Sequence, residues 1–278
     1  MFLNSHIPNP IAFSIGMFDI YWYGLFLVIA ILIGYWMAGN LARMRNMSEQ
    51  IISSIYLNAL ISGLIGARIY HVIFDWTFYA KNPSQILAVW NGGLAIHGAI
   101  IGAILCVLYF SRKHSDQSQT GPYFWKIADL FVVPAILGQA IGRWGNYFNQ
   151  ELFGAPTDAW YGIPIDIAHR PQEFIQSARF HPAFLYESVL CVLVFVVLLC
   201  VFKKQKRPDG LVFWLYLGLY SSVRIIVESI RINDAAMIAG IRLPLVISLL
   251  LATLSIIIIL KSFFNRKHFS MARDDIIS

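Results

Sequence analysis

The chain has 278 residues, of which 58% are hydrophobic and only 13% are charged, and its formal net charge is +6. So few charged side chains exclude a soluble globular domain of this length, whose surface needs far more polar residues. The composition therefore predicts an integral membrane protein.

Seven apolar stretches are long enough to cross about 30 Å of hydrocarbon as helices, at roughly 20 residues each. No low-complexity tract or internal repeat divides the chain, so we expect one all-α, polytopic domain over residues 1–278. Residues 1–16 carry no basic n-region and contain two prolines, which predicts that the first span is retained. The expected spans lie near residues 21–39, 50–74, 94–111, 127–144, 183–202, 211–230 and 243–260.

Basic residues predict the orientation, because short loops rich in Lys and Arg favour the cytoplasmic side. One side of the predicted spans holds thirteen basic residues and the other holds five. The thirteen are Arg43, Arg45, Arg112, Lys113, Lys126, Lys203, Lys204, Lys206, Arg207, Lys261, Arg266, Lys267 and Arg273, and the five are Lys81, Arg170, Arg179, Arg231 and Arg242. We therefore expect a periplasmic amino terminus and a cytoplasmic carboxyl terminus, and the net charge of +6 gives no indication of nucleic acid binding.

The longest predicted outer loop, residues 145–182, follows the fourth span. Loops beyond about 12–15 residues are usually functional or disordered. This loop contains Trp160, Tyr161, Phe174, Phe180 and four prolines, a composition unlike that of a flexible linker. We expect a folded periplasmic cap between spans four and five.

The cysteines and histidines give no sign of a metal centre or a disulfide framework. Cys106, Cys191 and Cys200 all fall within predicted spans, and no C-x-x-C spacing is present. The sequence also lacks the G-x-S-x motif of rhomboid-like proteases and the G-x-G-D motif of aspartyl intramembrane proteases. We expect neither a metal ion nor a cofactor.

Three arginines lie within the predicted spans, where each costs about 2.5–3.5 kcal/mol on insertion scales. At about 1.5 Å of rise per residue, Arg68 and Arg143 lie on the order of 25 Å from the cytoplasmic ends of their spans, and Arg224 on the order of 20 Å. Tyr23 and His97 begin their spans from the outer side, as Tyr186 and Glu187 do in the fifth. This convergence predicts a cationic site in the outer half of the bilayer.

Each of these residues also has a purely structural interpretation. Arg68 could snorkel to the outer interface. His97 could bridge helices, because Gly98 and Gly102 form a small-xxx-small pattern that lets helices approach closely. Arg224 and Glu228 are spaced i, i+4 and could form a self-neutralising pair.

The run G-R-W-G-N-Y-F-N-Q-E-L-F-G at 142–154 resembles the signature of the prolipoprotein diacylglyceryl transferases, G-R-x-G-N-F-x-N-x-E-x-x-G, with Tyr147 in place of the usual phenylalanine. Further motifs occur in the order that the family shows. They are WYG at 22–24, SGLIGAR at 62–68, NGGLAIHG at 91–98, HPAFLYE at 181–187 and Y-x-x-x-R-x-x-x-E at 220–228. The resemblance covers nearly the whole chain.

The resemblance implies an enzyme of the bacterial inner membrane that transfers the diacylglyceryl group of phosphatidylglycerol to the lipobox cysteine of a preprolipoprotein signal peptide, leaving glycerol 1-phosphate. It makes His97 the candidate base, while Arg143 and Arg224 meet the leaving phosphate. Asn146 is a candidate hydrogen-bond donor and Tyr23 a positioning phenol. The residues that we expect to bind substrate are Tyr23, Arg68, Arg143, Asn146, Glu151, Gly154, Tyr220, Arg224 and Glu228.

Two other classes of function remain open at the level of the residues. Intramembrane arginines also mark permeation paths, so a transporter or flippase for an anionic lipid or small anion is the alternative. Seven spans without evident duplicated halves fit poorly with the inverted repeats of many secondary transporters. Spacing alone also leaves open a lipid-binding receptor without catalytic activity.

Overall fold

The structure is a computed structural model that describes residues 5–114, 123–205, 207–232, 236–238 and 240–277. The chain forms two compact units, one of residues 1–34 with 132–278 and the other of residues 35–131. It passes between them within helix α1 (Trp22–Met44) and again within helix α5 (Tyr123–Phe148).

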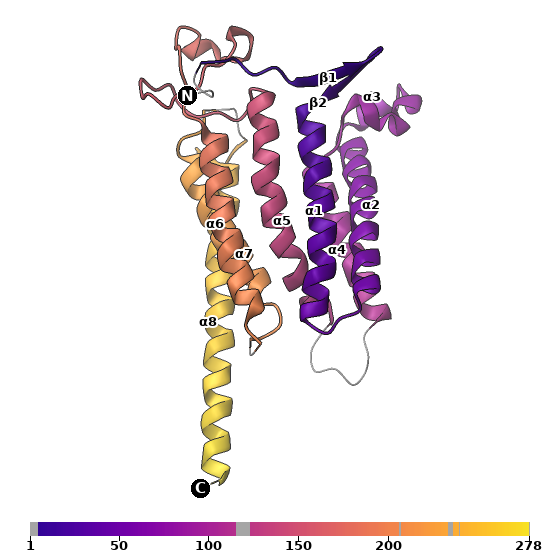
Figure 1. The fold of residues 1–278 in the computed structure, drawn as a ribbon, viewed down its shortest axis with the longest axis vertical. Coiled ribbons are helices and arrows are strands. Elements are labelled where there is room, and N and C mark those ends of the chain that lie inside the picture. Colours follow the sequence, from indigo (N-terminus) through magenta and orange to yellow (C-terminus); the bar gives the residue numbers. More distant parts are fainter. Residues whose placement is uncertain (1–4, 115–122, 206, 233–235, 239, 278) are drawn as a thin grey trace. The chain divides into compact units, whose positions relative to one another are not determined.

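The first unit is built on helices α6 (Ala183–Lys203), α7 (Leu211–Glu228) and α8 (Leu243–Ile277), with the end of α5 and the start of α1 (Figure 1). Helix α7 packs along both α6 and α8. An antiparallel hairpin of β1 (Ile11–Ile15) and β2 (Phe18–Tyr21) leads directly into α1, and a second hairpin of β3 (Met237–Ile238) and β4 (Ile241–Arg242) leads into α8. These two short hairpins are not predicted by the sequence pattern.

The second unit centres on helices α2 (Glu49–Phe74) and α4 (Ile96–Lys113), which pack against each other along their length. The connection between them contains α3 (Trp76–Tyr79) and two 3-10 turns, η2 (Pro83–Leu87) and η3 (Val89–Asn91). A Cβ atom at Gly98 would collide with the carbonyl oxygen of Gly66, and one at Gly102 with that of Ser62. The close approach that the small-xxx-small pattern predicted is therefore confirmed.

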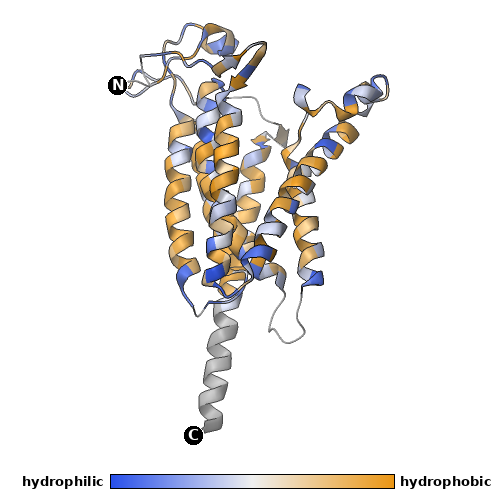
Figure 2. Ribbon diagram, turned by 45° about the vertical axis from the view of Figure 1, so that its right-hand side comes forward, coloured by the Kyte–Doolittle hydropathy of each residue, from blue (hydrophilic) through white to orange (hydrophobic). Residues whose placement is uncertain are grey.

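Among the residues that the structure describes, seven helices are long and apolar enough to cross a membrane, which confirms the predicted polytopic all-helical class. Figure 2 shows hydrophobic residues along these helices and hydrophilic ones concentrated near their ends. The fourth helix differs from the prediction at its carboxyl-terminal end, because it continues to Phe148. Gly145 and Asn146 therefore belong to a helix and not to the loop, and Arg143 and Asn146 lie on neighbouring turns of the same face. Of the basic residues used to predict orientation, Lys206 lies outside the described residues.

The loop after α5 folds around an apolar cluster that it shares with the adjoining helix ends. Phe180 forms bridges with both Pro156 and Ile163. The loop is also tied to the segment after α7, since the Ala155 amide donates to the carbonyl of Ile230 at 2.9 Å. The buried members of the cluster are Tyr147, Phe153, Ile163, Ile165, Phe180 and Phe184. This packing holds the end of α5 and the start of α6 in a fixed relation.

Candidate functional site

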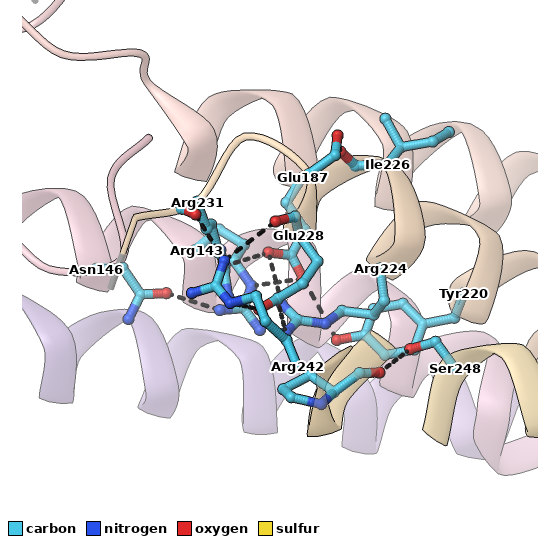
Figure 3. Close-up of polar contacts among 12 residues, drawn as sticks. Arg143, Asn146, Glu187, Tyr220, Arg224, Ile226, Glu228, Arg231, Arg242 and Ser248 are labelled. Carbon is cyan, nitrogen blue, oxygen red and sulfur yellow. Dashed lines mark hydrogen bonds and ion pairs between the residues drawn. The ribbon is translucent and has the colours of Figure 1, made fainter. Parts of the chain in front are cut away.

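The centre of the candidate site is the carboxylate of Glu187, on the second turn of α6, whose side chain is 0% exposed. Three guanidinium groups surround it (Figure 3). Its Oε1 atom lies 3.3 Å from Nε of Arg143, and its Oε2 atom lies 3.6 Å from Nη1 of Arg224 and 2.6 Å from Nη2 of Arg231. The Tyr220 hydroxyl donates to Oε1 at 3.3 Å. One buried carboxylate therefore links α5, α6, α7 and the segment that follows α7.

A second carboxylate, Glu228, lies at the end of α7. Arg224 is one turn before it and donates from Nη2 to Glu228 Oε2 at 2.9 Å, as the i, i+4 spacing predicts. Arg242 approaches the other oxygen of Glu228 with its Nε at 3.3 Å, and its Nη1 donates to the carbonyl of Arg231 at 2.6 Å. Arg224 thus bridges Glu187 and Glu228, so Arg224 and Glu228 are not an isolated pair.

The charges in this cluster do not balance. Arg143, Arg224, Arg231 and Arg242 face two buried carboxylates, which leaves a formal charge of +2 on this set of six residues. The side chains of Arg143 and Arg224 are 20% and 17% exposed, whereas that of Arg231 is 4% exposed. Burial lowers the pKa of Arg231 from its usual value, and the charge of Glu187 opposes that shift. The arrangement can receive an anion at the arginines that remain accessible.

A relay of side chains from the signature run orients Arg143. Its Nη1 donates to Oδ1 of Asn146 at 2.9 Å, and Nδ2 of Asn146 donates to Oε1 of Glu151 at 2.7 Å. Asn149 also reaches the same oxygen at 3.4 Å. Because Asn146 is buried and both ends of its amide are occupied, it fixes the direction from which Arg143 presents its guanidinium group.

Two signature glycines leave room for close neighbours. A Cβ atom at Gly145 would collide with the ring of Tyr23, which packs on this turn of α5. At Gly154 a Cβ atom would lie 2.7 Å from Cγ2 of Ile230 and 2.8 Å from Cβ of His181. Gly154 also forms an antiparallel bridge with Arg231, so the loop contacts the arginine cluster through its backbone. A side chain at position 154 would clash with these neighbours, so close packing explains the glycine there.

Arg68 lies in the second unit and is fully bonded to backbone. Its guanidinium group donates to the carbonyls of Gln85, Ile86, Ala88, Gly92 and Gly93, which occupies all five N–H donors. Gly92 and Gly93 adopt φ values of 86° and 73°, which glycine reaches without strain and which turn their carbonyls toward Arg68. These bonds favour a role in organising the loop between α2 and α4.

His97 also lies in the second unit, on the first turn of α4. Its side chain is exposed, and its ring centroid lies 5.8 Å from that of Tyr70 on α2. The structure therefore brings Tyr23, Asn146, Glu151, Gly154, Tyr220, Glu228 and the arginines Arg143 and Arg224 together in the first unit, and it places Arg68 and His97 in the second.

Three members of the cluster were missed as site residues. Glu187 is a polar residue of the fifth predicted span with no predicted role, and Arg231 and Arg242 are predicted only as outer-loop charges. The spacing of 224, 228 and 231 continues one helical face, which is a signal that could have found Arg231. Nothing in the local sequence points to Arg242, because it reaches the cluster from the hairpin before α8.

The part of the chain that the structure describes contains no evident metal-binding site. No group of three or more His, Cys, Asp or Glu side chains in these residues could hold a metal ion. The cysteines Cys106, Cys191 and Cys200 are free thiols.

The fold and the cluster define a polytopic membrane protein with a largely buried cluster of arginines that carries an excess of positive charge. The chain belongs to the prolipoprotein diacylglyceryl transferase family, whose sequence model matches residues 10–261 of this chain. It is 40% identical over 247 residues to the phosphatidylglycerol–prolipoprotein diacylglyceryl transferase of Nostoc sp., an alignment that covers 87% of this chain and 85% of the relative. Proteins of the same name from Trichormus variabilis and Acaryochloris marina are similar, at 40% over 254 residues and 41% over 244 residues. These alignments cover 90% and 87% of this chain, and 88% and 86% of the respective relatives.

Proposed function

We propose that this protein transfers the diacylglyceryl group of phosphatidylglycerol to the thiol of the lipobox cysteine of a preprolipoprotein, in the membrane of a bacterial cell. Family membership and the names of the relatives support transfer between these two substrates. They give no support to a transporter or flippase. The structural observation that carries the proposal is the arginine cluster around Glu187 and Glu228, which suits the phosphate of an anionic lipid.

In the proposed reaction, one carbon atom of the lipid glycerol exchanges its bond to the phosphate oxygen for a bond to sulfur. A carbon–sulfur bond forms to the cysteine, the carbon–oxygen bond to the phosphate breaks, and glycerol 1-phosphate leaves. The substrate thiol has a pKa near 8.5 in model peptides and attacks best as a thiolate, so a base accelerates the step. His97 is our candidate base, because imidazole accepts a proton near neutral pH and its side chain is exposed. The scheme requires no cofactor, and nucleic acid has no part in it.

The phosphate gains negative charge as the carbon–oxygen bond breaks. Guanidinium groups can meet two of its oxygens at once in a partly dry site, and such contacts strengthen as the charge grows. Arg143 and Arg224 are our candidates, because each keeps part of its side chain accessible. Asn146, Glu151 and Glu228 orient these two arginines through the contacts described above.

The remaining candidates contribute to binding in less direct ways. Tyr23 packs on the turn that carries Arg143 and can position the lipid headgroup with its phenol. Tyr220 holds Glu187, and Gly154 lets the loop reach the cluster. Arg68 acts on substrate only through the loop that it organises.

We further propose that the chain is one membrane domain over residues 1–278, with a periplasmic cap over 145–182 whose first four residues are the last turn of α5. We also propose a periplasmic amino terminus and a cytoplasmic carboxyl terminus. Single cysteines at Asn82 and Ala159, in a cysteine-free background, should react with an impermeant thiol reagent added outside spheroplasts. One at Gln205 should not react. Labelling at Gln205 alone would reverse the orientation.

The activity itself is tested with purified protein, phosphatidylglycerol and a lipobox peptide. Mass spectrometry should find a diacylglyceryl adduct on the cysteine, and glycerol 1-phosphate should appear in equal amount. A peptide with serine in place of that cysteine is the control and should gain nothing. Absence of both products with folded protein would remove the proposed function.

A further inference from the structure

Glu187 is the shared acceptor of the cluster, and its three arginine contacts are unequal. The shortest, at 2.6 Å, is to Arg231, the most buried of the three guanidinium groups. Arg143 and Arg224 lie farther away, at 3.3 Å and 3.6 Å. Arg231 therefore makes the shortest contact with the carboxylate, and the two more accessible arginines, Arg143 and Arg224, make longer ones.

An anion that enters the cluster has to share those two arginines with Glu187. Each of them already faces the carboxylate with a nitrogen, and the Tyr220 hydroxyl donates to its Oε1 atom. A phosphate oxygen can take over these guanidinium nitrogens while Arg231 keeps Glu187 in place. Glu187 and the phosphate of the substrate are thus competitors for the same donors.

The charge of the phosphate changes during the reaction that we propose. Phosphatidylglycerol carries a phosphodiester with one negative charge, whereas the released glycerol 1-phosphate is a monoester whose second pKa is near 6. The product is therefore close to a dianion at neutral pH. A cluster with a formal charge of +2 favours the product over the substrate, and without a competing carboxylate it would release the product slowly.

We propose that Glu187 is a positioning residue that competes with the departing phosphate for Arg143 and Arg224 and so sets the rate of product release. This inference rests on the proposed function, because it takes glycerol 1-phosphate as the product. It assigns to Glu187 a task that differs from neutralising buried charge. Removing the carboxylate should tighten the binding of product and slow turnover together.

Two variants and a control separate competition from net charge. Glu187→Gln removes the competitor but leaves Arg231 as a buried charge without its shortest partner, which destabilises the fold strongly. Glu187→Gln with Arg231→Met removes both members of the buried pair, so the formal charge of the cluster stays at +2. Glu49→Gln is the matched control, since it makes the same chemical change in an exposed pair with Arg43.

The measurements are the dissociation constant of glycerol 1-phosphate, by calorimetry on the purified protein without lipid or peptide, and kcat and KM for phosphatidylglycerol. In both Glu187 variants we expect product binding to tighten by about tenfold, which is about 1.4 kcal/mol. We expect kcat to fall by about tenfold without a rise in KM, while Glu49→Gln keeps wild-type values.

The double variant decides between the explanations even if Glu187→Gln does not fold. Wild-type product affinity in the double variant would overturn the inference, because it would mean that only net charge matters. Weaker product binding would overturn it as well. Wild-type protein that turns over lipid but binds no glycerol 1-phosphate would reject the inference and leave the proposed function intact, whereas absence of turnover would reject the function itself.

Discussion

Arginine occurs inside the membrane spans of both units, and its partners differ completely between them. In the second unit Arg68 donates to five backbone carbonyls and is only 8% exposed. In the first unit Arg143 and Arg224 face carboxylates at 2.9–3.6 Å and remain 17–20% exposed. The sequence predicted similar depths for Arg68 and Arg143, so depth does not distinguish them.

The kind of partner therefore decides whether an intramembrane cation stays available for a ligand. When neutral carbonyls accept from every N–H donor of an arginine, no donor remains for a ligand. The same bonds fix the loop that supplies the carbonyls. When several arginines share fewer carboxylates, an excess of positive charge remains. An incoming anion can then replace a carboxylate at some of the guanidinium N–H donors.

The largest effect is expected at His97, which would show that the second unit contributes chemistry as well as structure. His97→Ala should slow transfer by roughly 10²–10⁴-fold, the range typical of losing a general base. The protein should still fold and bind phosphatidylglycerol. Raising the pH toward 9 should recover part of the rate, because the substrate thiol then ionises without help. A variant with near-normal transfer would reduce His97 to a packing residue beside Tyr70.

Arg224→Gln should lower transfer by about 10²–10³-fold, as expected for losing a donor that stabilises developing charge. Arg224→Lys should recover only part of the rate, because an ammonium lacks the planar fork of a guanidinium group. Adding Glu228→Gln to Arg224→Gln should not restore activity. Arg224 also contacts Glu187 and Glu228 also contacts Arg242, so the two residues are not a self-contained pair. The rates are normalised to folded protein by thermal unfolding. Near-normal activity in the double variant would make the pair structural and leave Arg143 as the main phosphate contact.

Arg68→Met should act on stability instead of on chemistry. The substitution leaves the carbonyls between Gln85 and Gly93 without their donor, and buried unsatisfied groups cost about 1–3 kcal/mol each. We expect a lower unfolding temperature and increased protease cleavage in the loop, with transfer per folded molecule within a few-fold of wild type. Arg43→Met, at an exposed pair, is the control. A stable Arg68→Met protein with lost transfer would place Arg68 in the substrate site.

The sequence predicts those parts of this protein that depend on local pattern. Hydrophobic length locates the seven helices, and helical spacing brings Arg224 to Glu228. The count of basic residues failed to reveal Arg231 and Arg242 as cluster members, because it treats every cation outside a span as a solvated charge. The carbonyl partners of Arg68 lie 17–25 residues away in sequence, so no motif could reveal them. Which of these residues touches substrate stays a prediction.

The smallest effect is expected at Tyr147, where this chain differs from the family signature. Tyr147 follows Arg143 by one turn of α5, yet its ring belongs to the apolar cluster, 4.8 Å from Phe184 and 5.1 Å from Phe148 between centroids. Tyr147→Phe keeps this ring packing, so we expect transfer to stay at the wild-type level and the free energy of unfolding to change by less than about 1 kcal/mol. Tyr147→Ala should instead destabilise by about 3–5 kcal/mol, because it empties a large buried volume. Thermal unfolding and the transfer assay measure both. A tenfold loss of transfer in Tyr147→Phe would mean that the Tyr147 hydroxyl belongs to the site, on the same face of α5 as Arg143.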